Sequence, residues 1–311
     1  MFSIPSYARE KAIAYLLSRQ GKDGGYLFYQ YENVFESAID DTYYALATLR
    51  SLGVDAPNKD LTLRFLYSKI RREDLYIAYY CTNALCVLQG GLGDLSRSTY
   101  YASIRVKMLN WLERLIKPVQ DNCVNGLSWT LISPSNSLSD EIYAIELPSK
   151  LELIFMVLDL SRKLNLGLHK QNIGDELAKD ILEYLKLRNS FGIGVPNTSL
   201  IFYSLGILKL LDYPLKGLED IKQSIMKCED KSGGFNITPY SRFRTLEYTY
   251  KATEALRLLE VQPRFLELHK RFILGCQNGN GGFRRSIFVG ISTLKDTFYA
   301  TSALINLTDQ T

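Results

Sequence analysis

The stretch QNGNGGF at residues 277–283 has two counterparts in the chain, QGKDGGY at residues 20–26 and EDKSGGF at residues 229–235. Each version reads Gln or Glu, three residues, two glycines and an aromatic residue. Glycine adopts left-handed backbone angles that other residues resist, so we expect the glycine pair to end a helix and the aromatic ring to pack back over the joint. Recurrence of such a motif indicates an internal repeat.

The segments on either side of the motif predict the repeating unit. A helical pattern precedes each copy (KAIAYLLSR, LEDIKQSIMKC, LHKRFILGC), and a more apolar one follows it (DDTYYALATLRSL, EYTYKATEALRLL, DTFYATSALINL). The unit is therefore an αα-hairpin. Weaker copies end near Leu88, Leu160 and Leu211, so six hairpins fill the chain.

The two helices of a hairpin differ in polarity, and this difference predicts their places. The earlier helices have a polar face, as in GDELAKDILEYLKLR, whereas the later ones are apolar nearly all round, as in SLIFYSLGILKLL and KLELIFMVLDL. We therefore expect an all-α fold, a single α6/α6 toroid over residues 1–311 with the later helices inside. An open superhelix of the same hairpins is the alternative.

The composition narrows the class of protein. With 46% hydrophobic and 23% charged residues the chain is globular, and a net charge of +4 is too small to indicate nucleic-acid binding. Five cysteines without a C-x-x-C pair predict neither disulfides nor a zinc knuckle, and hence a cytoplasmic setting. The first residues do not read as a signal peptide, and no apolar run is long enough to span a membrane.

The pairs RFILGCQNGNGGF with DTFYATSAL, and KSGGF with EYTYKATEAL, resemble the repeats of the protein prenyltransferase β subunits and of the squalene-hopene and class II terpene cyclases. The resemblance extends over the whole chain and is sharpest in the first, fifth and sixth hairpins. It implies that the inner-helix N-termini open on one end of an aromatic-lined cavity that holds an isoprenoid. Counting back from the aligned leucines places the following residues there: Asp40/Asp41, Tyr76/Ile77, Ser149/Lys150, Ser199/Leu200, Glu247/Tyr248 and Lys295/Asp296.

Class II terpene cyclases carry a D-x-D-D motif whose middle Asp protonates an alkene or epoxide. AIDDT at residues 38–42 is similar, with Asp40 at the protonating position and Ala38 in place of the first Asp. Adjacent carboxylates resist double ionisation, which raises one pKa and favours a protonated acid. Asp41 and Glu247 are its predicted carboxylate partners, although Asp41 also fits an ordinary helix N-cap.

Aromatic residues on the inner helices are candidates to line the cavity and to stabilise a carbocation by cation–π attraction. Tyr44, Tyr76 and Tyr203 are the predicted lining residues. Aromatic stripes on buried helices are also what an ordinary core contains, so both interpretations stay open at this point.

Cationic loop residues precede the fifth and sixth inner helices and suit a diphosphate. By resemblance, Arg242 matches the prenyltransferase Lys that grips an isoprenoid diphosphate, and Tyr248 matches its Tyr. Asp296 is predicted to contact the substrate beside them. The predicted diphosphate-binding cations are Arg242, Arg244, Arg284, Arg285 and Lys295. Basic loop residues are also often merely solvated.

The zinc site of the prenyltransferase β subunits is not matched. Thr245, Glu247 and Asp296 stand where that family has its D-x-C and His ligands. Of the two histidines, His269 reads as a solvated or satisfied histidine on an outer helix. Asp41, Glu247 and Asp296 supply oxygen ligands, so magnesium is the metal they would suit.

The sequence thus predicts an isoprenoid-handling toroid, most concretely a class II-type cyclase of a prenyl chain or prenyl diphosphate. Asp40 is the predicted proton donor. The alternatives are a prenyltransferase-like protein without zinc and a non-catalytic toroid that binds a lipid or a protein. Transient membrane contact and an α-type partner subunit both stay open. Residues 117–150 are long for a hairpin joint and are predicted to form a lid.

Overall fold

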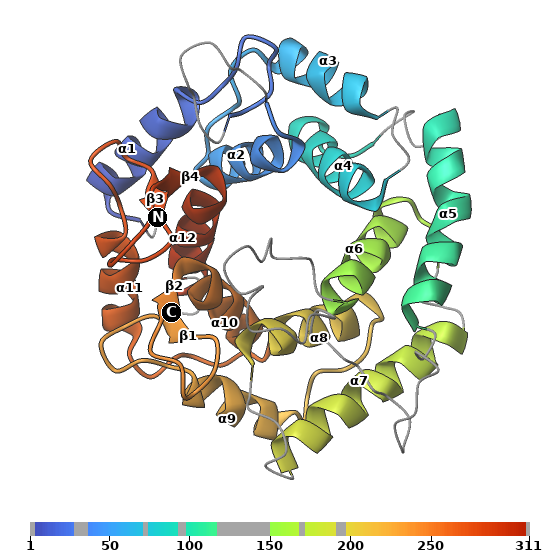
Figure 1. Ribbon diagram of the computed structural model, residues 1–311, viewed down its shortest axis with the longest axis vertical. Coiled ribbons are helices and arrows are strands. Elements are labelled where there is room, and N and C mark those ends of the chain that lie inside the picture. Colours follow the sequence, from blue (N-terminus) through green and yellow to red (C-terminus); the bar gives the residue numbers. More distant parts are fainter. Residues whose placement is uncertain are drawn as a thin grey trace, which may run out of the picture.

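The computed structural model describes residues 4–27, 37–70, 74–92, 98–116, 150–167, 172–190 and 197–308. Within them, outer and inner helices alternate along the chain (Figure 1). The outer helices are α1 (Ser6–Leu17), α3 (Lys59–Lys69), α5 (Thr99–Ile116), α7 (Asn172–Ser190), α9 (Glu219–Lys227) and α11 (Leu266–Gly275). The inner helices are α2 (Ile39–Ser51), α4 (Leu75–Gln89), α6 (Lys150–Lys163), α8 (Thr198–Leu210), α10 (Leu246–Leu258) and α12 (Leu294–Asn306). The predicted lid lies outside the described residues, except for Lys150.

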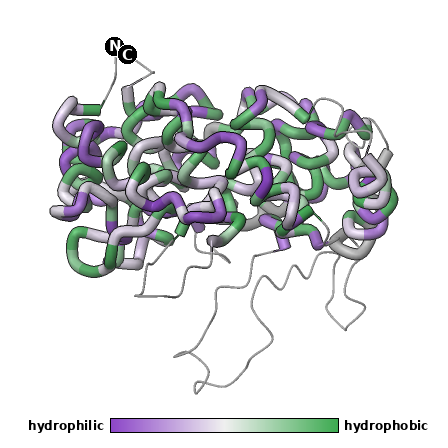
Figure 2. The backbone as a smooth tube through the Cα atoms, turned by 90° about the horizontal axis from the view of Figure 1, so that it is seen from above, coloured by the Kyte–Doolittle hydropathy of each residue, from purple (hydrophilic) through white to green (hydrophobic). Residues whose placement is uncertain are grey.

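The inner helices form a closed ring. Each packs against the inner helix before and after it, and α12 packs against α2 (Figure 1). Seen from the side, the molecule is a flat disc whose hydrophobic residues are spread through its thickness (Figure 2). The toroid prediction is confirmed and the open superhelix is wrong. None of the helices in the described part of the chain combines the length and apolar character needed to cross a membrane.

Each copy of the repeated motif contacts the outer helix of the next hairpin. Its first glycine has a positive φ and lies so close to the following outer helix that a side chain would not fit. A Cβ on Gly24 would lie 2.3 Å from the Leu61 carbonyl carbon, and one on Gly281 would lie 2.1 Å from the Lys11 carbonyl oxygen. The helix before the last motif ends at Cys276 in ordinary right-handed geometry. The glycine pair therefore builds a tight contact with the next hairpin and does not itself end the helix.

The Gln or Glu of the motif makes the same connection through hydrogen bonds. The Gln20 amide donates to the Pro57 carbonyl at 2.8 Å. The Gln277 amide donates to the Ala8 carbonyl at 2.8 Å, which joins the last hairpin to the first. The aromatic residues of the motif are fully buried: Tyr26, Phe235 and Phe283. The predicted packing of the ring over the joint is thereby confirmed, and the same chemistry closes the toroid.

Two short antiparallel ribbons, which the sequence patterns did not predict, precede the last two inner helices. β1 (Phe235–Asn236) pairs with β2 (Arg244–Thr245), and β3 (Phe283–Arg284) pairs with β4 (Ser292–Thr293). The pairing register places Phe235 and Phe283 each opposite the threonine that caps the following helix. The ribbons thus set where α10 and α12 begin.

The register of two of the three weaker copies differs by one helical turn from the sequence alignment, whereas Leu160 of the third is fully buried as aligned. Leu85 and Leu208 are fully buried, whereas Leu88 and Leu211 are partly buried. Helices that are apolar nearly all round offer several leucines at compatible positions, so the pattern alone does not select one.

Candidate functional site

A cavity of about 390 Å³ lies at the N-terminal ends of α2, α10 and α12. We call it the rim cavity. It is lined by Ala38, Asp40, Asp41, Glu247, Arg285, Thr293, Lys295, Asp296 and Tyr299. Six residues predicted as site residues from the sequence therefore do come together, from the first hairpin and from the last two.

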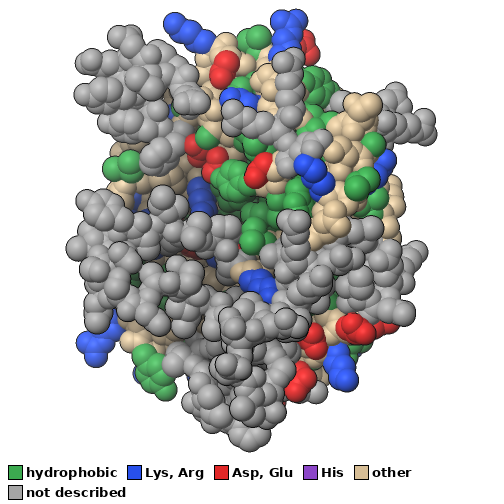
Figure 3. All heavy atoms as spheres, turned by 45° about the vertical axis from the view of Figure 1, so that its right-hand side comes forward, with side chains coloured by type: hydrophobic (Ala, Val, Ile, Leu, Met, Phe, Trp, Pro, Cys, Tyr) green, Lys and Arg blue, Asp and Glu red, His purple; other side chains and the backbone are tan. Residues whose placement is uncertain are grey.

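A second cavity, which we call the bore, lies inside the inner ring and measures about 230 Å³. Its aromatic lining consists of Tyr43, Tyr44, Tyr79, Tyr80, Phe155, Phe202, Tyr203, Tyr250, Phe298 and Tyr299. Tyr299 also lines the rim cavity, so the two spaces meet at this ring. In Figure 3, hydrophobic side chains fill the visible centre of the molecule, and acidic and basic side chains lie around them.

The aromatic rings of the bore pack against one another across neighbouring helices. The Tyr44 and Tyr80 hydroxyls are 3.0 Å apart, and Tyr250 stacks on Tyr299 with ring centroids 5.1 Å apart. Burial raises the pKa of Tyr44 and Tyr203 well above the ordinary value, so both phenols are neutral. The predicted lining roles of Tyr44 and Tyr203 agree with this geometry. Tyr76 instead lies 42% exposed, with its ring centroid 4.6 Å from that of Tyr80.

Glu247 is held by a buried ammonium group that the sequence analysis missed. Lys251 lies one turn later on α10 and is only 5% exposed. Its Nζ is 2.6 Å from a Glu247 carboxylate oxygen and 3.2 Å from the Ser199 hydroxyl. Burial alone would raise the pKa of Glu247, but Lys251, Lys295 and Arg285 together lower it. Glu247 is therefore an ionised carboxylate.

Asp296 has the opposite character, although it lines the same cavity. Its backbone N–H donates to the Thr293 hydroxyl at 2.8 Å, and that hydroxyl donates to the Asp296 carboxylate at 2.8 Å. Burial, with a contribution from the nearby Glu247 charge, raises the pKa of Asp296 to about 6. Asp296 is therefore protonated up to a higher pH than an ordinary aspartate, and part of its population is protonated near neutral pH.

Asp40 and Asp41 lie in the first turn of α2 and do not cap it. The N-cap residue is Ala38, which makes no side-chain hydrogen bond. The prediction that Asp41 is a cap is therefore wrong. Asp41 is buried, and Asp40 is half-buried. Burial and then a hydrogen bond to Asp40 raise the pKa of the Tyr76 phenol.

Ala38 stands where other inner helices carry a capping side chain. The capping residues at this place are Asp74, Asn197, Thr245 and Thr293. Ala38, which interrupts the D-x-D-D pattern, thus also leaves α2 without a capping side chain. The helix dipole still favours negative charge in this first turn.

Three of the five predicted diphosphate-binding cations do not line the rim cavity. Arg244 forms an ion pair with Asp230 at 2.6 Å within the preceding motif. Arg284 donates to the Ile287 carbonyl at 3.0 Å, and Arg242 is exposed at the surface. Tyr248 lines neither cavity. Arg285 and Lys295 are the predicted cations that do reach the rim.

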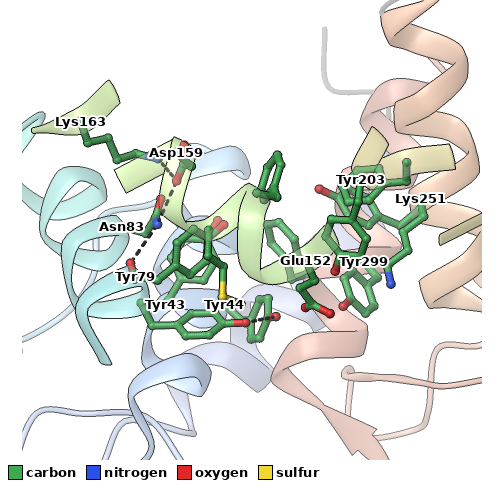
Figure 4. Close-up of a pocket in the computed structure, with 16 residues that line it drawn as sticks. Tyr43, Tyr44, Tyr79, Asn83, Glu152, Asp159, Lys163, Tyr203, Lys251 and Tyr299 are labelled. Atoms are coloured by element: carbon green, nitrogen blue, oxygen red, sulfur yellow. Dashed lines mark hydrogen bonds and ion pairs between the residues drawn. The ribbon is translucent and has the colours of Figure 1, made fainter. Parts of the chain in front are cut away.

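The third inner helix places Glu152, and not Ser149 or Lys150, inside the ring. Glu152 lines the bore, and its negative charge and hydrogen bond contribute to the raised pKa of Tyr203, after burial. Asn83, Asp159 and Lys163 also line the bore. Figure 4 shows these three at one end, while Glu152, Tyr203, Lys251 and Tyr299 lie at the other. The signal available in the sequence was the acidic residue inside the apolar run KLELIFMVLDL.

The structure gives the environment of His269 and leaves the magnesium prediction untested. His269 lies on outer helix α11, as predicted, but it is fully buried. Its Nδ1 accepts from the Gly234 N–H at 2.8 Å, and its Nε2 lies 2.9 Å from the Glu229 carboxylate. Among the described residues, no three His, Cys, Asp or Glu side chains are grouped as metal ligands would be. Magnesium at the rim stays a prediction.

Comparisons with known proteins agree with the fold. A family model described as the prenyltransferase alpha-alpha toroid domain matches residues 1–129 and 179–311. A search of curated protein sequences found no match.

Two solved proteins with a similar fold are described in complex with isoprenoid compounds. Candida albicans protein geranylgeranyltransferase-I, complexed with GGPP, matches with a TM-score of 0.61 and 14% identity, covering 97% of this chain and 86% of that one. A variant of the type II terpene cyclase MstE from Scytonema, in complex with its substrate geranylgeranyl dihydroxybenzoate, matches with a TM-score of 0.55 and 13% identity, covering 98% of both chains. At these identities the likeness shows the fold alone.

Proposed function

This chain belongs to the prenyltransferase alpha-alpha toroid family, and we propose that it is a class II-type cyclase that protonates an isoprenoid at the rim cavity and stabilises the resulting cation in the bore. The observation that carries the proposal is Tyr299, whose ring lines both cavities. We infer from this shared residue that one ligand can extend from the acidic groups of the rim to the aromatic faces of the bore.

The charge balance of the rim cavity supports an acid-initiated reaction over diphosphate binding. Four carboxyl groups line it against two cations, Arg285 and Lys295. Lys251 adds a third cation beside Glu247, so the site has no net charge when Asp296 is protonated and is net negative when Asp296 is ionised. A diphosphate would therefore gain no net attraction there, and an uncharged alkene needs none.

Asp296 has the properties required of the proton donor. Its raised pKa of about 6 leaves part of the population protonated near neutral pH. The Thr293 hydroxyl donates to its carboxylate and orients it. Asp40, the donor predicted from the D-x-D-D resemblance, lies in the same cavity and is the alternative that the experiment below compares.

The proposed reaction is an isomerisation. The Asp296 O–H bond breaks and leaves its electron pair on the carboxylate, while the alkene π pair forms the new C–H bond. The tertiary cation is then attacked by a second alkene of the same chain, which forms the ring C–C bond. Loss of a proton from a carbon next to the final cation forms the product alkene, and the carboxylate regains a proton. Neutral aromatic faces stabilise the intermediate cations.

The experiment is to incubate the purified protein with squalene, geranylgeraniol or geranylgeranyl diphosphate and to analyse extracts by mass spectrometry. We expect a product with the mass of the substrate and fewer double bonds, which Asp296→Asn abolishes. Asp60→Asn, in the first turn of outer helix α3, is the matched control and should keep activity. Loss of product in Asp40→Asn, with Asp296→Asn still active, would move the donor role to Asp40. No product from any substrate would refute the cyclase.

A prenyltransferase-like reaction without zinc is the second candidate. Arg285 and Lys295, which do reach the rim, are the observation that favours it. Tight binding of geranylgeranyl diphosphate without turnover, lost in an Arg285→Gln and Lys295→Gln double variant, would support this reading and contradict the cyclase.

A further inference from the structure

The bore contains a polar group at the end opposite the rim, formed by Asn83, Asp159 and Lys163, which we call the far-end cluster. Lys163 forms an ion pair with Asp159 one turn earlier on α6. The Asn83 amide, from α4, donates to the Asp159 carboxylate at 3.3 Å and to the Tyr79 carbonyl at 2.9 Å. Figure 4 shows the three side chains together, apart from Glu152 and Lys251.

This placement is unusual for an ion pair between residues four apart on a helix. Such pairs normally lie on the solvated face and stabilise a helix only slightly. A nearby ion pair between two segments does lie at the exposed surface: Arg162 of α6 pairs with Asp212, which follows α8. Asp159 and Lys163 instead face a cavity that is otherwise mainly aromatic, with 17% and 28% of their side chains accessible. Apolar residues there would avoid the desolvation of two charges.

The far-end cluster also has a defined distance from the rim end. Glu152 and Asp159 lie on the same face of α6, two turns apart. At 1.5 Å per residue they are separated by about 10 Å along the axis. Ordinary carbon–carbon bond lengths make this the span of about eight main-chain carbons in an extended chain.

We propose that the far-end cluster binds the neutral hydroxyl group of an isoprenoid alcohol or phenol whose chain extends through the bore toward the rim. This inference rests on the proposed function, because it names the end of the substrate that is not protonated. The Asp159 carboxylate accepts the hydroxyl hydrogen, and the Lys163 ammonium donates to the hydroxyl oxygen. The pair has no net charge, so a neutral head group is favoured over a diphosphate.

Saturated ligands test the head-group site without any dependence on catalysis, since they have no alkene to protonate. Binding of 1-octanol, 1-chlorooctane and octyl phosphate is measured by titration calorimetry. We expect 1-octanol to bind the unmodified protein about tenfold more tightly than 1-chlorooctane, which has the same chain but no hydroxyl. Equal affinity of the two, or tightest binding of octyl phosphate, would overturn the proposal.

Variants assign the preference to the cluster. Lys163→Met and Asp159→Asn should each reduce the preference for the alcohol to about twofold. Arg162→Met removes the exposed ion pair between α6 and Asp212 and should leave the preference at about tenfold. A preference that survives both cluster variants would show that another group binds the hydroxyl. If either variant fails to fold by circular dichroism, the comparison of the three ligands on the unmodified protein still decides.

The outcomes also separate this inference from the proposed function. Turnover of squalene and geranylgeraniol at equal rates, unaffected by Lys163→Met, would leave the cyclase standing and remove the head-group site. Selective binding of 1-octanol without turnover of any alkene would do the reverse.

Discussion

The closure of the ring depends on a contact in which Gly281 touches the backbone of α1. Gly281 has a φ of 90°, and a Cβ there would lie 2.1 Å from the Lys11 carbonyl oxygen. Gly281→Ala must therefore adopt a left-handed conformation, which costs about 1–2 kcal/mol. It must also push α1 away from the motif, which stretches the hydrogen bond from Gln277 to Ala8, at a cost of about 1 kcal/mol.

We call the contact between Gly281 and α1 the seam. Loosening of the fully buried core beside it adds to these two terms, so we expect a loss of roughly 3–5 kcal/mol in the free energy of unfolding. For a chain of this size that corresponds to a fall in Tm of roughly 10 °C. The assay is urea unfolding followed by circular dichroism, with Tm from a thermal scan.

Gly279→Ala is the matched control, because it lies in the same turn and nothing lies within 4 Å of its added Cβ. It should change the free energy of unfolding by less than about 0.5 kcal/mol. If the two variants differ by less than about 1 kcal/mol, the seam is not a tight joint and the account of how the motif closes the ring is wrong.

Four further predictions concern charged groups. The folded-state pKa of Asp296 is raised from 3.8 to about 6, so the folded state favours the protonated carboxyl group. The free energy of unfolding should therefore fall as the pH rises from about 4 to 6. Urea unfolding at pH 4 to 7 measures this dependence, and Asp296→Asn should remove it. The rate of cyclisation should fall above pH 6, because Asp296 then loses the proton that it donates; a pH–rate profile measures this. Lys251→Met leaves the Glu247 carboxylate in the cavity without its 2.6 Å partner and should destabilise the protein by about 3 kcal/mol; a change below 1 kcal/mol would mean that water replaces the ammonium. The Glu229 carboxylate accepts a hydrogen bond from the Phe265 N–H and contacts His269. Glu229→Ala should lower the free energy of unfolding by at least about 2 kcal/mol more than Glu229→Gln, because the glutamine amide oxygen can still accept. Equal losses of stability in thermal unfolding would contradict this.

Much of the fold could be predicted from the sequence, because its determinants are local. The motif glycines and the contrast between polar and apolar helices specify the αα-hairpin and its inner side. The two short ribbons and the one-turn shifts in two of the weaker copies could not be predicted. Leu85 and Leu88 are equally compatible with an apolar helix, and contact with neighbouring helices decides which one is fully buried.

The candidate site was predicted less completely. Asp40, Glu247 and Asp296 were correctly expected to share one end of the ring, since equivalent positions of a repeat lie at equivalent heights. Arg244 was expected beside them but binds Asp230 instead. A loop side chain selects its partner by three-dimensional distance, which repeat spacing does not describe.

The sequence by itself therefore determined the hairpin, the number of its copies and the end of the ring at which acidic residues gather, because each depends on a periodicity that local backbone geometry enforces. The tertiary structure alone decided that Tyr299 borders both the rim cavity and the bore, that Lys251 neutralises Glu247, and that Asp159 and Lys163 face inward. These depend on which side chains meet across the closed ring, and closure brings together helices that are nearly the whole chain apart.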